Sequence, residues 1–212
     1  MPVLLSKNAN THLKSEFSDV ILVDKTAPVY DAVSCHADIY YCRLPNGDVM
    51  KALDGEIGEK YPRNIGFNAV CLDKYFIHNL KFTNRRLMEY VQNLGLKLIN
   101  VRQGYTKCSC VVVDSNSVIT ADDGIYNTLS KFEEIDVLKI QNGYVKLDGF
   151  EYGFLGGASG RVGDTLYFSG DVTRHPDFAS IKTFVENRNV KLKWFDFELT
   201  DIGSIIEYNS II

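Results

Sequence analysis

The 212-residue chain lacks any run of about 18 apolar residues, the length that a membrane-spanning helix requires. Its N-terminal stretch, MPVLLSK, is too short and lacks the flanking pattern of a secretory signal peptide. We therefore expect no membrane segment, no membrane partner and a cytoplasmic location.

Cysteines are few, and no two of them form a CxxC pair. There are five, an odd number, which is typical of reduced thiols in a cytosolic protein and not of a disulfide scaffold. Cys108 and Cys110 lie two positions apart but have no partners at metal-ligand spacing. The sequence thus predicts neither a zinc site nor any other metal or cofactor.

An excess of positive charge is also missing. Lys and Arg number 23 against 27 Asp and Glu, which gives a formal net charge of −4 and a pI near 5.6. Proteins that bind nucleic acids or anionic membranes normally carry a basic face. We expect no nucleic-acid partner.

What the chain does contain is ample apolar material and a recurring β-hairpin. Hydrophobic residues make up 45% of the sequence, enough for the core of a single domain over residues 1–212. The clearest hairpin is CVVVDSNSVITAD, from Cys110 to Asp122, in which two apolar strands flank a polar turn. Asp122 and Asp123 are good helix caps, so we expect a helix and then a strand over 137–140.

Similar units are predicted along the whole chain. Further hairpins are expected over 39–52, with Asn46-Gly47 in the turn, and over 68–78, 161–169 and 205–212. Helices are expected over 10–17, 84–94 and 176–187, and single strands over 20–23, 96–101 and 192–197.

Aligning the five hairpins places one small or polar residue at the start of each first strand: Asp38, Asn68, Cys110, Gly160 and Ser204. These positions are 30 to 50 residues apart, a spacing typical of folds built from repeated units. The chain begins with a helix and strand that lack a hairpin, and it ends with a hairpin that lacks a helix. The two ends would therefore complete one unit and close a ring without exposed strand edges.

This repeat pattern resembles the pentein superfamily of guanidine-modifying enzymes over nearly the whole chain. The superfamily contains arginine deiminases, amidinotransferases, dimethylarginine hydrolases and a non-catalytic ribosome anti-association factor. The resemblance implies an α/β fold, a five-fold pseudosymmetric α/β-propeller whose ring is closed by the N- and C-terminal segments. An ordinary three-layer α/β domain is the alternative.

The resemblance does not extend to the catalytic residues. In the enzymes a cysteine starts the last hairpin, a histidine starts the middle one, and an acidic residue follows paired glycines. The corresponding positions here are Ser204, Ser109 or Cys110, and Ala158 or Ser159. The expected Cys/His pair is thus not matched, and the resemblance does not establish that the protein is an enzyme.

Other residues remain candidates for chemistry. His36 and Asp38 lie at i and i+2, so on a strand both would project to one side as an acid–base pair or as two metal ligands. A metal site would need further ligands that this spacing does not supply. Cys110 is a candidate nucleophile with His36 as its base. The alternative is that these are polar residues at strand ends, with Cys110 a small core residue.

The glycines at 156 and 157 and the nearby Arg161 suggest an anion-binding position, where backbone amides and a guanidinium grip a carboxylate. The alternative is that these glycines only permit a tight strand entry. With Asn68 and Ser204, Arg161 completes the set of predicted ligand-binding residues.

The sequence thus predicts a protein that binds a small polar molecule at the ring axis. The alternatives are a non-catalytic scaffold for a protein or ribonucleoprotein, and an atypical hydrolase of guanidino or amide C–N bonds. A central pocket lined by His36, Asp38, Asn68, Cys110 and Arg161 would favour the first, and a plugged axis with an exposed apolar face would favour the scaffold.

Overall fold

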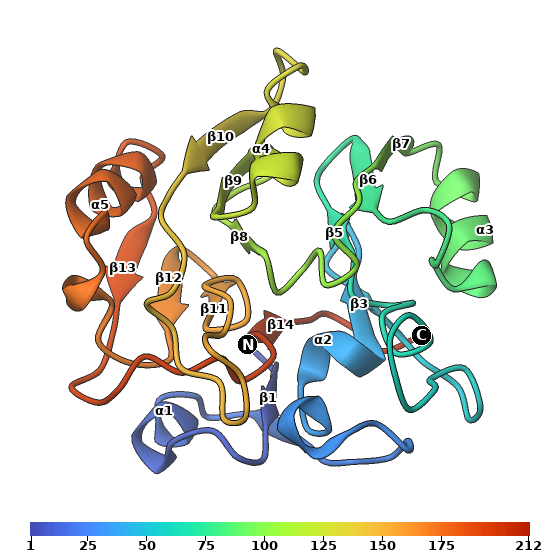
Figure 1. Ribbon diagram of the computed structural model, residues 1–212, viewed down its shortest axis with the longest axis horizontal. Helices are drawn as coiled ribbons and strands as arrows, with labels where there is room; N and C mark the ends of the chain where they lie inside the picture. Colours follow the sequence, from blue (N-terminus) through green and yellow to red (C-terminus); the bar gives the residue numbers. More distant parts are fainter.

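The computed structural model describes residues 1–212 and has five separate β-sheets of two or three strands each. The sheets lie around the middle of the molecule, and most of the helices lie on the outside (Figure 1). No helix in the structure is both long enough and apolar enough to cross a membrane.

Three of the sheets are built alike from consecutive segments. In each, an antiparallel hairpin is followed by a helix and then by a strand that pairs in parallel with a strand of the hairpin. In chain order the elements are β5 (Val70–Cys71), β6 (Tyr75–His78), α3 (Arg85–Asn93) and β7 (Lys97–Asn100); β8 (Cys110–Val112), β9 (Ser117–Thr120), α4 (Asp123–Leu129) and β10 (Asp136–Lys139); and β11 (Ser159–Val162), β12 (Thr165–Phe168), the 3-10 helix η2 (Val172–Arg174), α5 (Phe178–Glu186) and β13 (Lys191–Lys193).

The two ends of the chain meet in a fourth sheet. Strand β1 (Val3–Ser6) pairs in parallel with β2 (Val20–Val23), and helix α1 (Thr11–Ser15) connects the two. On its other side β1 pairs antiparallel with β14 (Ile206–Glu207). The order β14-β1-β2 therefore joins residues from opposite ends of the sequence.

The fifth sheet has only two strands, β3 (Tyr41–Arg43) and β4 (Val49–Lys51). It is preceded by the 3-10 helix η1 (Asp31–Val33) and the short helix α2 (Ala37–Tyr40). The last residues of the chain run along β4, where the amide of Val49 donates to the carbonyl of Ser210 at 2.8 Å. This contact covers an edge that would otherwise be exposed.

Local signals in the sequence locate most of these elements. The side chain of Asn84 accepts a hydrogen bond from the amide of Leu87 and caps α3, and Asp122 caps α4 in the same way through Ile125. Each bond satisfies an amide that has no partner within the helix. Apolar side chains of these helices then pack on their own sheets, as Leu87 does in the cluster that contains Phe76.

The prediction of a five-fold pseudosymmetric propeller closed into a ring is wrong. The structure is a mixed α/β arrangement of small separate sheets, and no sheet closes. The units are also unequal, because the β3–β4 hairpin is followed by an irregular segment without a helix or third strand. The sequence pattern captured the recurrence of hairpins but not these differences between them.

The strand predicted at His36 and Asp38 is also wrong. Asp38 lies in helix α2, and His36 is the residue at its N-cap. The helix is fixed by a distant contact, in which the amide of Asp38 donates to the carbonyl of Gly203 at 3.1 Å. Their side chains therefore do not alternate as on a strand.

Candidate functional site

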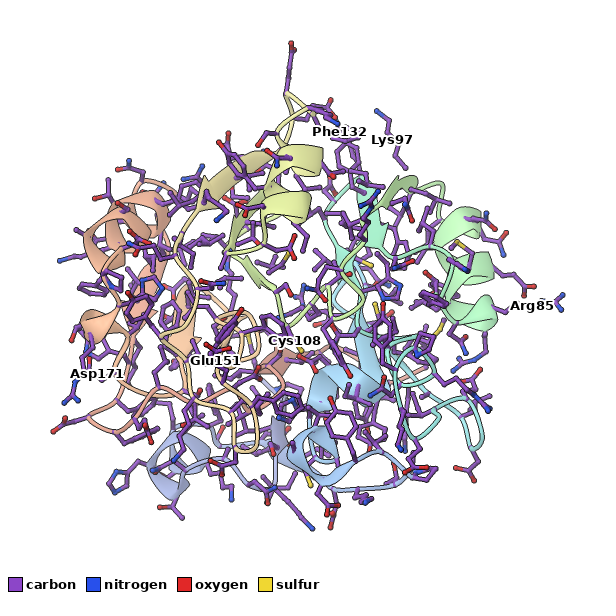
Figure 2. The ribbon with its side chains drawn as sticks, viewed as in Figure 1. Arg85, Lys97, Cys108, Phe132, Glu151 and Asp171 are labelled. Atoms are coloured by element: carbon purple, nitrogen blue, oxygen red, sulfur yellow. The ribbon has the colours of Figure 1, made fainter.

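A cluster of polar side chains lies near the middle of the molecule. We define the central cluster as His36, Asp38, Asn68, Cys108 and Ser204, all of which are buried. They come from the N-cap and first turn of α2, from the segment before β5, from the segment before β8 and from the segment before β14. Cys108 lies near the centre of the view, whereas Arg85 and Asp171 lie at opposite edges (Figure 2).

Asp38 is the hub of the central cluster. Its side chain is fully buried, and its Oδ2 accepts hydrogen bonds from Ser204 Oγ at 2.7 Å and from Cys108 Sγ at 3.1 Å. Its other oxygen, Oδ1, has no hydrogen-bond partner. One carboxylate oxygen of Asp38 thus accepts two hydrogen bonds, and the other accepts none.

Asn68 orients the thiol of Cys108. Its Oδ1 accepts from the amides of Lys107 and Cys108 at 2.8 and 3.2 Å, which turns its Nδ2 toward the sulfur at 3.2 Å. Asn68, two residues before β5, thus connects the segment before β5 to the turn before β8.

His36 lies beside a second carboxylate, that of Asp201. The distance from His36 Nδ1 to Asp201 Oδ1 is 3.7 Å, and this nitrogen is buried without a hydrogen-bond partner. Gly203 allows this close packing, because a Cβ there would lie 2.1 Å from the Cβ of His36 and its φ is +73°.

Burial sets the protonation of these groups. It raises the pKa of Asp38, and it raises the pKa of Asp201 to about 6. It lowers the pKa of His36 and, together with the charge of Asp38, raises the pKa of Cys108 well above the ordinary thiol value. Without a bound cation, Cys108 is therefore a protonated donor to Asp38 and not a thiolate nucleophile.

Lys107 connects the central cluster to an open cavity. Its Nζ donates to Ser204 Oγ at 3.0 Å and to the carbonyl of Gly156 at 3.2 Å. The same side chain lines a cavity of about 280 Å³ bordered by β3, β5, β8, β11 and β14. The charged residues of its lining are Arg43, Asp73, Lys107, Asp114, Arg161 and Glu207.

The residues predicted to bind or react fall into three groups. Asp38, Asn68 and Ser204 meet in the central cluster, and His36 lies two residues before Asp38, with its ligand atoms within 4.8 Å of those of Asp38 and Cys108. Arg161 lines the cavity instead, where it donates to the carbonyls of Val113 and Gly163.

Cys110, the predicted nucleophile, lies outside the central cluster. It is packed in an apolar cluster that includes Val118 and Ile125, and burial raises its pKa to about 12. An apolar setting of this kind makes a thiol unreactive. The place expected for Cys110 is taken by Cys108, two residues earlier.

Sequence reasoning missed Cys108, Lys107 and Asp201. The first two lie in turns before β8, and Asp201 lies in an irregular segment after β13. The tetrapeptide of residues 104–107, Gly-Tyr-Thr-Lys, recurs in part at 143–146, and it is the one local signal that marks Lys107.

Comparison with known proteins gave one match. A family described as a family of unknown function (DUF6873) matches residues 48–206. No curated protein and no solved structure matches the chain.

Proposed function

The chain belongs to this family of unknown function, DUF6873. From the residues of the chain itself, we propose that the protein binds a small polar molecule in the cavity that Lys107 lines. The ligand carries a carboxylate at one end and a cationic group at the other. The observation that carries the proposal is that Lys107 and Arg161 line the same cavity and that neither pairs with a carboxylate of the protein.

The two cations suit an anionic group. Lys107 is half-buried and bonds only to neutral oxygens, those of Ser204 and Gly156. Arg161 donates from Nε and Nη1 to backbone carbonyls, so its Nη2 can donate to a ligand. Hydrogen bonds between ionised groups are about twice as strong as neutral ones, so a carboxylate gains from both residues.

One carboxylate of the cavity suits a cationic group. Asp73 is exposed and makes neither an ion pair nor a side-chain hydrogen bond. The other two acids are engaged, Asp114 with Arg188 and Glu207 with Arg43, each pair at 3.7 Å. The free charges of the lining therefore match a zwitterion.

The size of the cavity limits the ligand. Its volume of about 280 Å³ is near the lower end of small-molecule sites, which start at roughly 300 Å³. An amino acid with a basic side chain has the required charges and fits this size. Arginine is the first ligand to test, and the resemblance to guanidine-modifying enzymes remains a prediction that points the same way.

The geometry does not favour the hydrolase alternative. A thiol that attacks a C–N bond must reach the substrate as a thiolate, whereas Cys108 is 3% exposed and donates to Asp38. Of the five residues that the sequence predicted around a central pocket, only Arg161 lines this cavity, so the proposed site is not the predicted one. The scaffold alternative stays a prediction.

The test is calorimetric titration with arginine, with agmatine, which lacks the carboxylate, and with pentanoate, which lacks the cationic group. Arginine should bind about 10- to 100-fold more tightly than either, the equivalent of one charge-assisted hydrogen bond. Lys107→Gln should remove the advantage of arginine over agmatine, and Asp73→Asn its advantage over pentanoate.

Lys131→Gln is the matched control, because Lys131 is exposed and has no ion pair. Equal affinities for all three compounds, or an unchanged preference for arginine in Lys107→Gln, would remove the basis of the proposal.

A further inference from the structure

The central cluster contains three different metal-ligating groups in close proximity. The ligand atoms of His36, Asp38 and Cys108 all lie within 4.8 Å of one another, and all three residues are buried. We propose that these residues form a binding site for a divalent transition metal ion, for which Zn²⁺ is the best match.

Unpartnered atoms in the group point to a missing ligand. Asp38 is fully buried and His36 is 4% exposed, yet Asp38 Oδ1 and His36 Nδ1 have no hydrogen-bond partner. Leaving a buried polar atom without a partner costs about 1 to 3 kcal/mol, so such atoms are rare in folded proteins. A metal ion bound by both side chains removes this cost.

The charges of the cluster also favour a cation. Asp38 and Asp201 are both buried beside His36, and Lys107 is the one basic side chain that reaches the cluster. Ionisation of Cys108 would add a further negative charge. A divalent ion offsets these charges, and the proton that leaves the thiol on binding goes to solvent.

The ligand types select the metal. A thiolate excludes Mg²⁺ and Ca²⁺, which prefer oxygen ligands, while a set of one sulfur, one nitrogen and one oxygen suits Zn²⁺. Zinc bonds are about 2.0 to 2.3 Å long, so a tetrahedral site places its ligand atoms roughly 3 to 4 Å apart. The three ligand atoms lie within 4.8 Å of one another, so binding requires them to approach by up to roughly 1 Å, and three protein ligands leave the fourth tetrahedral position for water or another ligand.

The sequence predicted no metal because its local spacing supplied only two of the ligands. His36 and Asp38 are two residues apart in the chain, whereas the third ligand, Cys108, follows Asp38 by 70 residues. The metal site is separate from the cavity of the proposed arginine site, because His36, Asp38 and Cys108 do not line that cavity. Either proposal can therefore fail without the other.

The test uses the full chain, stripped of metal by a chelator and titrated with Co²⁺ and then Zn²⁺. We expect one equivalent of Co²⁺ to produce a cobalt–thiolate charge-transfer band, and Zn²⁺ to displace it. Cys108→Ser should abolish the band and weaken Zn²⁺ binding by at least about 100-fold, since loss even of an outer partner of a metal site costs 10- to 100-fold. Cys110→Ser is the matched control and should retain both.

Several results would overturn the site. They are a wild-type protein without the cobalt–thiolate band, a band that survives in Cys108→Ser, or a band that is lost in Cys110→Ser while that variant stays folded. Should Cys108→Ser not fold, X-ray absorption of the zinc-loaded wild type decides the question. One sulfur and otherwise nitrogen or oxygen neighbours support the site, and a shell without sulfur refutes it.

Discussion

Acidification should destabilise the protein through His78, a buried histidine that is not part of the central cluster. The imidazole is fully buried, with Nε2 3.1 Å from the carbonyl of Gly104 and Nδ1 2.8 Å from the hydroxyl of Thr83. The carbonyl only accepts, so Nε2 carries the proton and Nδ1 accepts from Thr83. Burial disfavours the charged ring and lowers the pKa of His78 from 6.5 to about 4.

The sign and size of the effect follow from this difference. At neutral pH the ring is uncharged in both states and contributes nothing. As the pH falls below 6.5, the unfolded chain binds a proton that the folded protein does not bind until about pH 4. The free energy of unfolding therefore falls across this window, by about 3 kcal/mol in total at roughly 1.4 kcal/mol per pKa unit.

The assay is urea unfolding of the wild type and His78→Gln at about pH 7 and about pH 4.5, analysed by linear extrapolation. Glutamine does not titrate and keeps an amide that can donate to Gly104. The wild type should lose about 2 to 3 kcal/mol more than the variant between the two pH values, because all other titrating groups are shared. Equal losses in the two proteins would refute the assignment of a neutral buried His78.

Two further predictions concern packing and capping. Gly160→Ala should lower the free energy of unfolding, measured with urea, by roughly 1 to 3 kcal/mol or more. The reason is that a Cβ at this position would lie 1.8 Å from the carbonyl oxygen of Ile205. An unchanged free energy of unfolding would mean that β11 does not contact the segment before β14. Asp122→Ala should cost about 1 kcal/mol, because it removes the cap that accepts from the amide of Ile125 at 2.8 Å; no change at neutral pH would contradict the capping role.

Local chemistry made much of the secondary structure predictable. The Asn46-Gly47 turn does connect β3 and β4, with Gly47 at φ +86°, and Asn84 and Asp122 do cap helices. Gly95 follows α3 at φ +73°, as expected for a glycine that ends a helix. These features depend on residues that are close in the chain, so the sequence alone contains the required information.

Elements fixed by distant partners were not predictable in this way. Strand β1 is a four-residue run without turn signals, and one of its two partners is β14, about 200 residues later. Helix α2 ends in Tyr40, followed by Tyr41, residues that favour strands, yet the contact with Gly203 holds the segment in a helical turn.

The same limit applies to the candidate site. Asp38, Asn68 and Ser204, which the alignment of the hairpins placed at equivalent positions, do lie together in the structure. The fold that brings them together is not the closed ring that the alignment predicted. The sequence predicted Cys110 at the site, but Cys110 begins β8 and packs into the core, whereas Cys108 precedes the strand in a turn and lies in the central cluster. No local pattern distinguishes these two cysteines.

The most direct test of the account is a crystal structure of the protein grown with saturating arginine. We expect the carboxylate within about 3 Å of Lys107 Nζ, with Arg161 beside it, and the guanidinium directed at Asp73. Arginine bound at any other place, or a cavity without arginine at a concentration that saturates the calorimetric signal, would contradict the proposed binding site.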